Sequence, residues 1–194
     1  MGRSVLVWDA PNIDSTLASI IDGKPTARER PDLAVLGKWL VEQAGPECEV
    51  EGCIFVNVAP HVAGPLRGWV LWLLEQGFRV FAKPKYGESD VDVDMVDHLA
   101  RRYDEGGLDT VFVGSHDADS FVGPLTEMLE RGVSVTVLAF TEFAGELAVL
   151  PAARVVDLET IDGLFGEALP RIALDSLPPE GRWFEPTGTL LPGG

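Results

Sequence analysis

Aspartates gather in three separate segments of the chain. Asp9 follows the apolar run SVLVW of residues 4–8, four more lie in DVDVDMVD of residues 90–97, and Asp117 and Asp119 follow the run TVFVGS. Like charges brought this close repel and raise one another's pKa unless a cation compensates them. Carboxylate oxygens select hard divalent cations, Mg²⁺ or Mn²⁺, rather than softer metals. The pattern therefore predicts a metal site built from aspartates of all three segments.

The softer metal-ligating residue types offer no competing pattern. The three histidines are scattered through the chain, and the two cysteines, Cys48 and Cys53, match no zinc spacing. Their odd spacing would place the two cysteines on opposite faces of a strand. We therefore expect neither a zinc site nor a disulfide.

Short apolar runs alternate with amphipathic segments along the chain. We expect strands at residues 4–8, 53–58, 78–82, 110–113, 133–140 and 154–157, and helices at residues 32–43, 66–76, 91–103 and 121–130, with a further short helix at 141–149. Pro11 and Asn12 predict a polar loop after the first strand, and residues 23–31 predict an exposed loop. Continuous apolar strands joined through helices predict a three-layer α/β/α domain with a central, mainly parallel sheet.

The expected sheet brings the aspartates that follow strands to one place. Ligands of parallel sheets bind beyond the carboxyl ends of the strands, where the strand order reverses. Asp9, Asp117 and Asp119 follow strands, so they converge if the first strand and the strand at 110–113 are neighbours. As an alternative, Asp117 and Asp119 could simply cap the helix that follows them.

The acidic segment 90–97 lies at the start of a predicted helix, near the same rim. Three of its aspartates share one helical face, whereas Asp92 points elsewhere unless it lies at the helix N-cap; the three are Asp90, Asp94 and Asp97. Capping and favourable interaction with the helix dipole are an alternative role for Asp90 and Asp92.

Length, composition and charge narrow the class of protein. A chain of 194 residues, 46% hydrophobic and 24% charged, is a folded domain with room for a full core. We expect one domain over residues 1–168 and a proline-rich tail over 169–194 that packs on it through Leu174, Trp183 and Phe184. The apolar runs are too short to span a membrane, and a cytoplasmic location is the default expectation. A net charge of −16 argues against a protein that grips nucleic acid by charge alone, but not against a nuclease.

The aspartate motifs resemble those of the NYN family of PIN-like ribonuclease domains. The resemblance covers residues 4–140 and has three parts in order: Asp9-Ala10-Pro11-Asn12 at the end of the first strand, Val91-Asp92-Val93 at a helix start, and Ser115-His116-Asp117-Ala118-Asp119-Ser120-Phe121 after the fourth strand. It implies a PIN-like, Rossmann-like sheet of order about 3-2-1-4-5 and metal-dependent attack of water on an RNA phosphodiester. The residues expected around one or two Mg²⁺ or Mn²⁺ ions are Asp9, Asp92, Asp117 and Asp119, and Asn12 would orient Asp9 or touch the scissile phosphate.

Three departures from the family pattern affect this interpretation. His116 replaces a glycine, Ser120 separates the last aspartate from Phe121, and the second helical aspartate of the family falls about one residue from Asp97. The remaining ligand position is thus open among three aspartates, with Asp94 the expected choice beside Asp90 and Asp97. The histidine could narrow the site, shuttle a proton, or lie on the surface.

Basic and polar residues near the predicted rim could hold the substrate. We expect phosphate contacts from Lys83 and Lys85 after the third strand, and from Ser115 and His116 after the fourth. The leading hypothesis is a ribonuclease that acts on single-stranded RNA. The alternative is a non-catalytic PIN-like module that binds RNA, a nucleotide or a protein partner, and a homodimer also stays open. Another Mg²⁺-dependent phosphohydrolase is disfavoured, because Ala10-Pro11 follows Asp9 where a DxDx[TV] motif would be needed.

Overall fold

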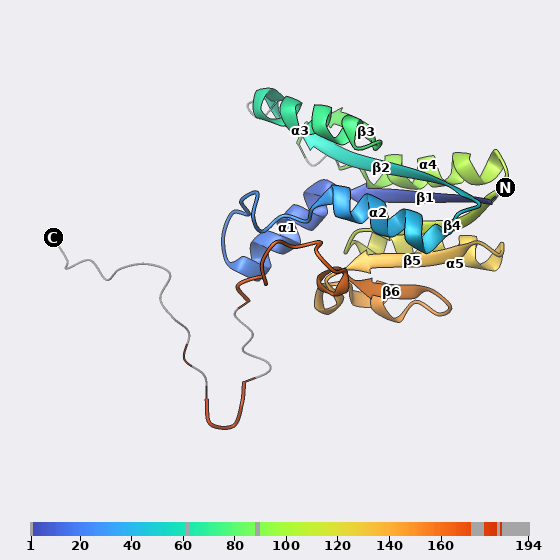
Figure 1. Cartoon of the computed structure of the whole chain (residues 1–194). Coiled ribbons are helices and arrows are strands. Elements are labelled where there is room, and N and C mark those ends of the chain that lie inside the picture. The colour runs from blue at the N-terminus through green and yellow to red at the C-terminus, as the bar shows by residue number, and fades with distance from the viewer. Residues whose placement is uncertain (1, 61–62, 88–89, 172–176, 182, 184–194) are drawn as a thin grey trace.

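The computed structural model describes residues 2–60, 63–87, 90–171, 177–181 and 183. Within these residues the chain forms six strands and five α-helices, and most successive strands are joined through a helix (Figure 1). The strands are β1 (Gly2–Asp9), β2 (Cys48–Val58), β3 (Arg79–Pro84), β4 (Leu108–Gly114), β5 (Ser134–Ala139) and β6 (Arg154–Asp157). The helices are α1 (Ala10–Ile21), α2 (Leu33–Ala44), α3 (Ala63–Glu75), α4 (Asp92–Asp104) and α5 (Ala118–Glu130), and 3-10 helices lie at Thr141–Phe143, Gly145–Val149 and Leu158–Thr160.

All strand pairs in the sheet are parallel, and their order is β3-β2-β1-β4-β5-β6. The predicted order 3-2-1-4-5 is therefore confirmed, with β6 added beyond β5. The central strand β1 pairs with β2 on one side and β4 on the other, so Val7 lies between Cys53 and Val113. From β1, the strands β2 and β3 are added on one side of the sheet, and β4, β5 and β6 then follow on the other side. The order reverses between β1 and β4.

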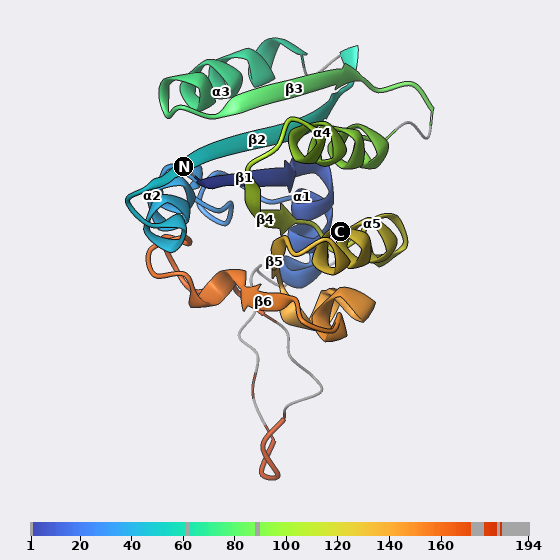
Figure 2. The same ribbon diagram turned by 90° about the vertical axis from the view of Figure 1, so that its right-hand side faces the viewer.

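Two layers of helices cover the sheet, as Figures 1 and 2 show. Leu6 and Trp8 of β1 pack into one buried cluster with α1, α2 and Leu73 of α3. Val5 and Val7 pack into a second cluster with α4 and α5. Side chains alternate across a strand, so a run that is apolar at every position is buried on both faces. The predicted three-layer α/β/α architecture follows from this property of β1 and is confirmed.

The segment after β1 is the largest departure from the expected elements. Residues 10–21 form α1, so the prediction of a polar loop at Pro11 and Asn12 is wrong. Asp9 is the N-cap and accepts a hydrogen bond from the backbone nitrogen of Asn12 at 2.9 Å. Pro11 lies in the first turn, where a missing N–H costs no helical hydrogen bond. Ile13, Leu17 and Ile20 then follow at helical spacing and are buried.

The start of the predicted tail packs on the domain. Leu169 is buried in the core, and Arg171 forms ion pairs with Glu142 and Glu159. Trp183 is 93% exposed, so it does not make the packing contact expected of it. Within residues 177–181, the described segment before it, the chain carries Pro178, Pro179 and Gly181 and forms only a turn. Leu174 and Phe184 lie outside the described residues.

Cys48 and Cys53 are both free cysteines, as expected from their spacing. None of the helices that the structure describes has the length and apolar character needed to cross a bilayer.

Gly114, the last residue of β4, provides a test of packing at the reversal of strand order. A Cβ atom on Gly114 would lie 2.2 Å from the Trp8 ring, whereas one on Gly123 in α5 would meet nothing within 4 Å. We expect Gly114→Ala to lower the free energy of unfolding by about 1–3 kcal/mol, because a buried Trp8 must shift. Gly123→Ala should leave stability unchanged or raise it by up to about 1 kcal/mol. Denaturant unfolding measures both, and equal stability of the two variants would contradict the packing described.

Candidate functional site

The candidate site lies beyond the carboxyl ends of β1 and β4. These strands are neighbours and flank the reversal of strand order, as the convergence of the aspartates required. Asp9 closes β1 and caps α1, and Asp117 follows β4 and caps α5. Both carboxylates therefore lie at helix N-termini, where the helix dipole favours negative charge.

Asp9 is held in place by burial and by its cap hydrogen bond. Its exposed fraction is 4%. Burial raises the pKa of Asp9, the hydrogen bonds from the Asn12 backbone and from Asp92 lower it, and the charges of Asp117 and Asp90 raise it. The net effect is a raised pKa. The carboxylate is thus poorly solvated and coupled to other acids of the site.

Asp92 is the first residue of α4 and faces Asp9. It is 7% exposed, and its pKa is raised to about 8 by burial first, then by the charge of Asp9, a hydrogen bond with Asp9 and the charge of Asp117. Among the described residues, its Oδ1 atom is buried without a hydrogen-bond partner. Val91 is the N-cap of α4 and Asp92 is its first helical residue, so Asp92 does not lie at the N-cap position considered for it in the sequence.

Asp117 serves as a cap and keeps acceptor capacity. Its Oδ1 accepts from the Ser120 backbone nitrogen at 3.2 Å, and its Oδ2 accepts from the Ser120 hydroxyl at 2.9 Å. The fully buried Ser115 accepts from the Asp117 backbone nitrogen at 3.1 Å through its hydroxyl. The capping interpretation is thus correct in geometry. It does not exclude ligation, because an ionised carboxylate has about four acceptor positions.

The other aspartates considered as ligands have different surroundings. Asp94 forms an ion pair of 2.7 Å with Lys83 of β3, whose ammonium also donates to the Asp90 carbonyl oxygen at 3.2 Å. Asp90 precedes α4, so it is not part of the helical face on which it was expected with Asp94 and Asp97. Asp97 and Asp119 are exposed. The structure brings together Asp9, Asp92 and Asp117. The metal-ligand roles of these three, of Asp94 and of Asp119 all stay predictions.

The predicted substrate-binding residues from β3 differ in their surroundings. Lys83 is bound to Asp94 at the start of α4, beside the acidic group. Lys85 is exposed and is tied to β2 through its backbone nitrogen, which donates to the Val58 carbonyl oxygen at 3.0 Å. Phosphate binding by either lysine stays a prediction.

His116 is half-buried, and both of its ring nitrogens have partners in the protein. Its Nε2 accepts from the Phe140 backbone nitrogen at 2.9 Å, and its Nδ1 lies 3.0 Å from Asn12 Oδ1 and 3.1 Å from Thr16 Oγ1. Burial lowers the pKa of His116 to about 4, although the charge of Asp157 opposes this shift. Both ring nitrogens are engaged by the protein, and the ring is neutral near pH 7.

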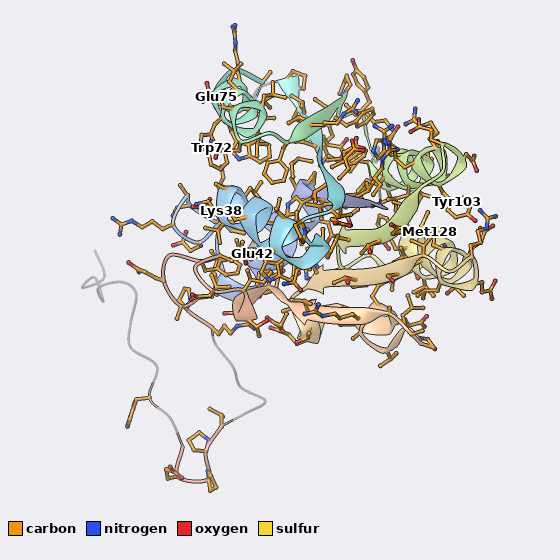
Figure 3. All side chains as sticks on the ribbon, turned by 45° about the vertical axis from the view of Figure 1, so that its right-hand side comes forward. Lys38, Glu42, Trp72, Glu75, Tyr103 and Met128 are labelled. Carbon is orange, nitrogen blue, oxygen red and sulfur yellow. The ribbon has the colours of Figure 1, made fainter. Side chains whose placement is uncertain are left out.

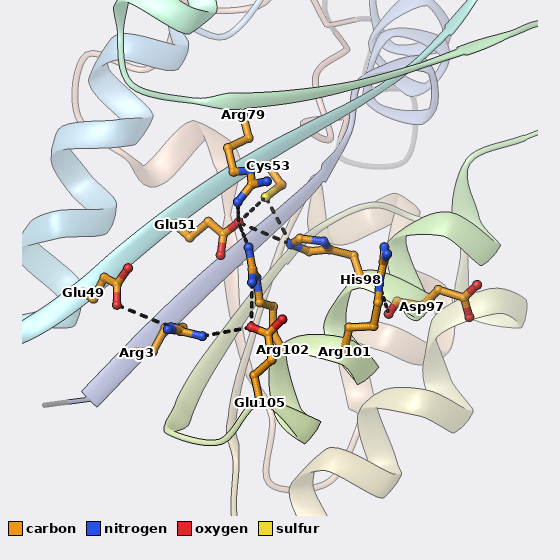
Figure 4. A network of polar contacts seen from close by, with 10 residues as sticks. All are labelled: Arg3, Glu49, Glu51, Cys53, Arg79, Asp97, His98, Arg101, Arg102 and Glu105. Atoms are coloured by element: carbon orange, nitrogen blue, oxygen red, sulfur yellow. Dashed lines mark hydrogen bonds and ion pairs between the residues drawn. The ribbon is translucent and has the colours of Figure 1, made fainter.

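A second cluster of potential ligands was not expected from the sequence. Glu51, Cys53 and His98 have ligand atoms within 4.8 Å of one another, with Cys53 Sγ and His98 Nε2 3.3 Å apart. Figure 4 shows that Glu51 is also the hub of an ion-pair network, because its Oε1 accepts from Arg102 at 2.7 Å and from Arg79 at 3.1 Å. The cluster joins residues of β2 with His98 of α4, which are 45 or more positions apart in the sequence, so only the fold reveals it.

This second cluster is poorly suited to a cation. Two guanidinium groups already occupy the Glu51 oxygen that a metal would need. Burial, then the charge of Glu51, raises the pKa of the Cys53 thiol to about 12, so forming the thiolate is costly. We therefore interpret the network as a structural link between β2, β3 and α4.

The aspartate group fits a hard divalent ion better. It supplies only carboxylate oxygens, and Asp92 contributes a buried oxygen atom without a partner among the described residues. The oxygens of Asp9, Asp92 and Asp117 do not all lie within 4.8 Å of one another, a test that only the Glu51 cluster meets among the described residues. Mg²⁺ commonly keeps several waters and uses one or two carboxylates, so this wider spacing is compatible with it.

The fold and the site together define a PIN-like α/β protein with buried acids at the reversal of strand order. The NYN domain family model matches residues 3–159, and the chain belongs to that family, whose fold is the PIN-like nuclease fold. A crystal structure of a protein of unknown function from Vibrio parahaemolyticus RIMD 2210633 is similar, with a TM-score of 0.65 and 19% identity over 84% of this chain and 95% of that one. This likeness supports the fold alone. No curated protein matches the chain.

The raised pKa of Asp92 predicts how stability depends on pH in the presence of a chelator. The folded protein keeps the Asp92 proton up to about pH 8, whereas the unfolded chain loses it near its ordinary value of 3.8. The free energy of unfolding should therefore fall as pH rises through this window, because the unfolded state binds fewer protons. Urea unfolding in EDTA should show a shallower fall in Asp92→Asn. An identical pH dependence in wild type and Asp92→Asn would contradict the buried, protonated Asp92, and Asp104→Asn is the control.

The Glu51 network predicts a specific loss of stability. Glu51→Ala leaves Arg102 and Arg79 without their shared acceptor, and we expect a loss of about 2–3 kcal/mol. Glu49→Ala is the matched control, since its pair with Arg3 is 3.5 Å long and its side chain is 58% exposed. It should cost less than about 1 kcal/mol. Thermal and urea unfolding measure both losses, and an equal loss in Glu51→Ala and Glu49→Ala would contradict the stabilising role of the Glu51 network.

Proposed function

We propose that the protein is a divalent-metal-dependent ribonuclease that hydrolyses phosphodiester bonds of single-stranded RNA. The observation that carries this proposal is the buried pair Asp9 and Asp92, coupled in charge to Asp117 at the reversal of strand order. Two buried acids of raised pKa are costly unless a proton or a cation compensates them. Membership of the NYN family supports a nuclease role for this place.

The acids together would form the proposed metal site. Asp9, Asp92 and Asp117 would hold Mg²⁺ or Mn²⁺, and Asp119 and Asp94 would complete the set directly or through water. A bound ion of this kind activates water and stabilises the attacking and leaving oxygens of an in-line displacement. Asp92 must lose its proton to act as a ligand, so ion binding and deprotonation of Asp92 are linked.

The residues around the acids would bind the RNA backbone. The Asn12 oxygen accepts hydrogen bonds from His116, which leaves the amide nitrogen as the group that can donate to a phosphate oxygen. Lys83 would exchange its contact with Asp94 for a phosphate, and Lys85 and the exposed Tyr86 follow it in the same segment. Exposed phosphate contacts of this kind fix the position of a nucleic acid without reading its sequence.

Cleavage of labelled single-stranded RNA tests the proposal. Wild type should cleave with Mg²⁺ or Mn²⁺ and lose cleavage in EDTA. Asp9→Asn, Asp92→Asn and Asp117→Asn should each reduce the rate at least about 100-fold, more than loss of an outer partner of a metal ligand costs. Asp104→Asn removes the same charge at the exposed end of α4 and should retain the wild-type rate.

The same experiment separates the enzyme from the binding module. Addition of Mn²⁺ should raise the melting temperature of wild type, and of Asp9→Asn much less, because binding to the folded state stabilises it. Equally low cleavage by wild type and all three variants would reject the nuclease. RNA binding retained under those conditions would leave the non-catalytic module as the function.

A further inference from the structure

His116 is the residue at which this chain departs most from the family pattern, and it connects three elements around the proposed site. It follows β4, its backbone nitrogen donates to Asn12 Oδ1 at 2.9 Å, and its Nε2 accepts from Phe140 just after β5. Its Nδ1 approaches both Asn12 and Thr16 of α1. A glycine here could make the backbone contact but none of the ring contacts.

The direction of these hydrogen bonds follows from the chemistry of the groups. A backbone N–H can only donate, so the Phe140 nitrogen makes Nε2 an acceptor without a proton. The proton of the neutral ring is then on Nδ1, which donates to Asn12 Oδ1 at 3.0 Å or to Thr16 Oγ1 at 3.1 Å. The backbone donor at His116 independently identifies the Asn12 atom it contacts as the oxygen. The orientation of the Asn12 amide is therefore determined by its partners.

Stacked groups hold the His116 ring in this position. The ring lies parallel to that of Phe140, with centroids 5.6 Å apart and planes inclined by 3°. The Arg171 Cζ atom lies 5.7 Å from the centroid of the Phe140 ring. The rings of Phe143 and His116 are in an edge-to-face arrangement, with centroids 6.5 Å apart. A ring packed on its face and bonded at both nitrogens has little freedom to rotate.

Asn12 in turn connects this group to the acids. Its backbone nitrogen donates to Asp9 Oδ1, while its side-chain oxygen is bound to His116. Asn12 thus holds Asp9 through its backbone nitrogen, and the hydrogen bonds from His116 to its side-chain oxygen set the direction of its amide nitrogen.

We propose, on the basis of the nuclease function above, that His116 is a positioning residue that aims the Asn12 amide nitrogen at a phosphate oxygen of the bound RNA. Its ring acts as a fixed donor to Asn12 and takes no part in proton transfer. Small displacements of a group that contacts the reacting centre reduce rate strongly, so loss of this support should appear in kcat more than in KM.

Two variants separate the two sides of the ring. The amide nitrogen of His116→Asn can replace Nδ1 as a donor to Asn12, whereas the amide oxygen of His116→Gln can replace Nε2 as an acceptor for Phe140. We expect His116→Gln to lower kcat by about 10–100-fold with KM changed less than about threefold, in the range for outer partners of functional groups. His116→Asn should show a smaller fall in kcat. Melting temperatures of both variants, compared with wild type, check that the variants are folded.

A double-mutant cycle with Asn12→Ala tests whether His116 acts through Asn12. In the Asn12→Ala background, His116→Gln should change kcat less than about twofold, because the group it positions is absent. Independent, multiplicative effects of the two substitutions would overturn the proposal. So would a larger loss of kcat in His116→Asn than in His116→Gln.

The proposal can fail separately from the nuclease function. If wild type does not cleave RNA, the function fails, and the side-chain amide signals of Asn12 in ¹⁵N–¹H NMR spectra still test the positioning. They should resemble wild type in His116→Asn and shift in His116→Gln. If the Asn12 signals are the same in wild type and His116→Gln, His116 does not position this amide.

Discussion

Burial of two carboxyl groups against each other is the constraint on which the site depends. Asp9 and Asp92 are 4% and 7% exposed, and burial is the first cause of the raised pKa of each. An isolated buried carboxylate is costly, so the pair must share a proton or bind a cation. Neither side chain can rotate out to the solvent easily, since Asp9 ends the central strand and Asp92 begins α4. The cost of the pair is thus offset by the packing of the whole sheet against its helices.

The start points of the helices explain why the acids meet at this edge. Helices that connect parallel strands run back across the sheet, so α1, α4 and α5 all begin beyond the carboxyl ends of strands. Asp9 and Asp117 are the N-caps of two of them, and Asp92 is the first residue of the third. Helix N-termini favour anions, which stabilises the carboxylates and would favour a phosphate in the same place. Capping by Asp9 and Asp117 is therefore compatible with the metal ligation proposed for them.

The sequence predicted the parts of the fold that depend on local patterns. Runs such as residues 5–8 and 111–113 are apolar at every position, and this property alone indicates strands covered on both faces. The helix at residues 10–21 was missed because Pro11 and Asn12 are common in loops, although the proline is equally suited to a first helical turn. The contacts of His116 could not be predicted from the sequence for another reason. They join residues 24 and 104 positions apart, and no local pattern encodes such pairs. The Glu51 network, which spans β2, β3 and α4, is hidden in the same way.

The strong negative charge of the chain is compatible with an RNA substrate when distance is considered. Charges separated by more than roughly 8 Å are largely screened at physiological ionic strength, so the net charge of −16 says little about the field at one edge of the sheet. At that edge Lys83 already neutralises Asp94, and a bound divalent ion would reverse the local sign. The acids would then attract phosphate indirectly. In the proposed site, the ion would hold an RNA phosphate and a few oriented donors such as the Asn12 amide would place it, so the fixed hydrogen bonds around His116 would matter for the orientation of the phosphate rather than for net attraction.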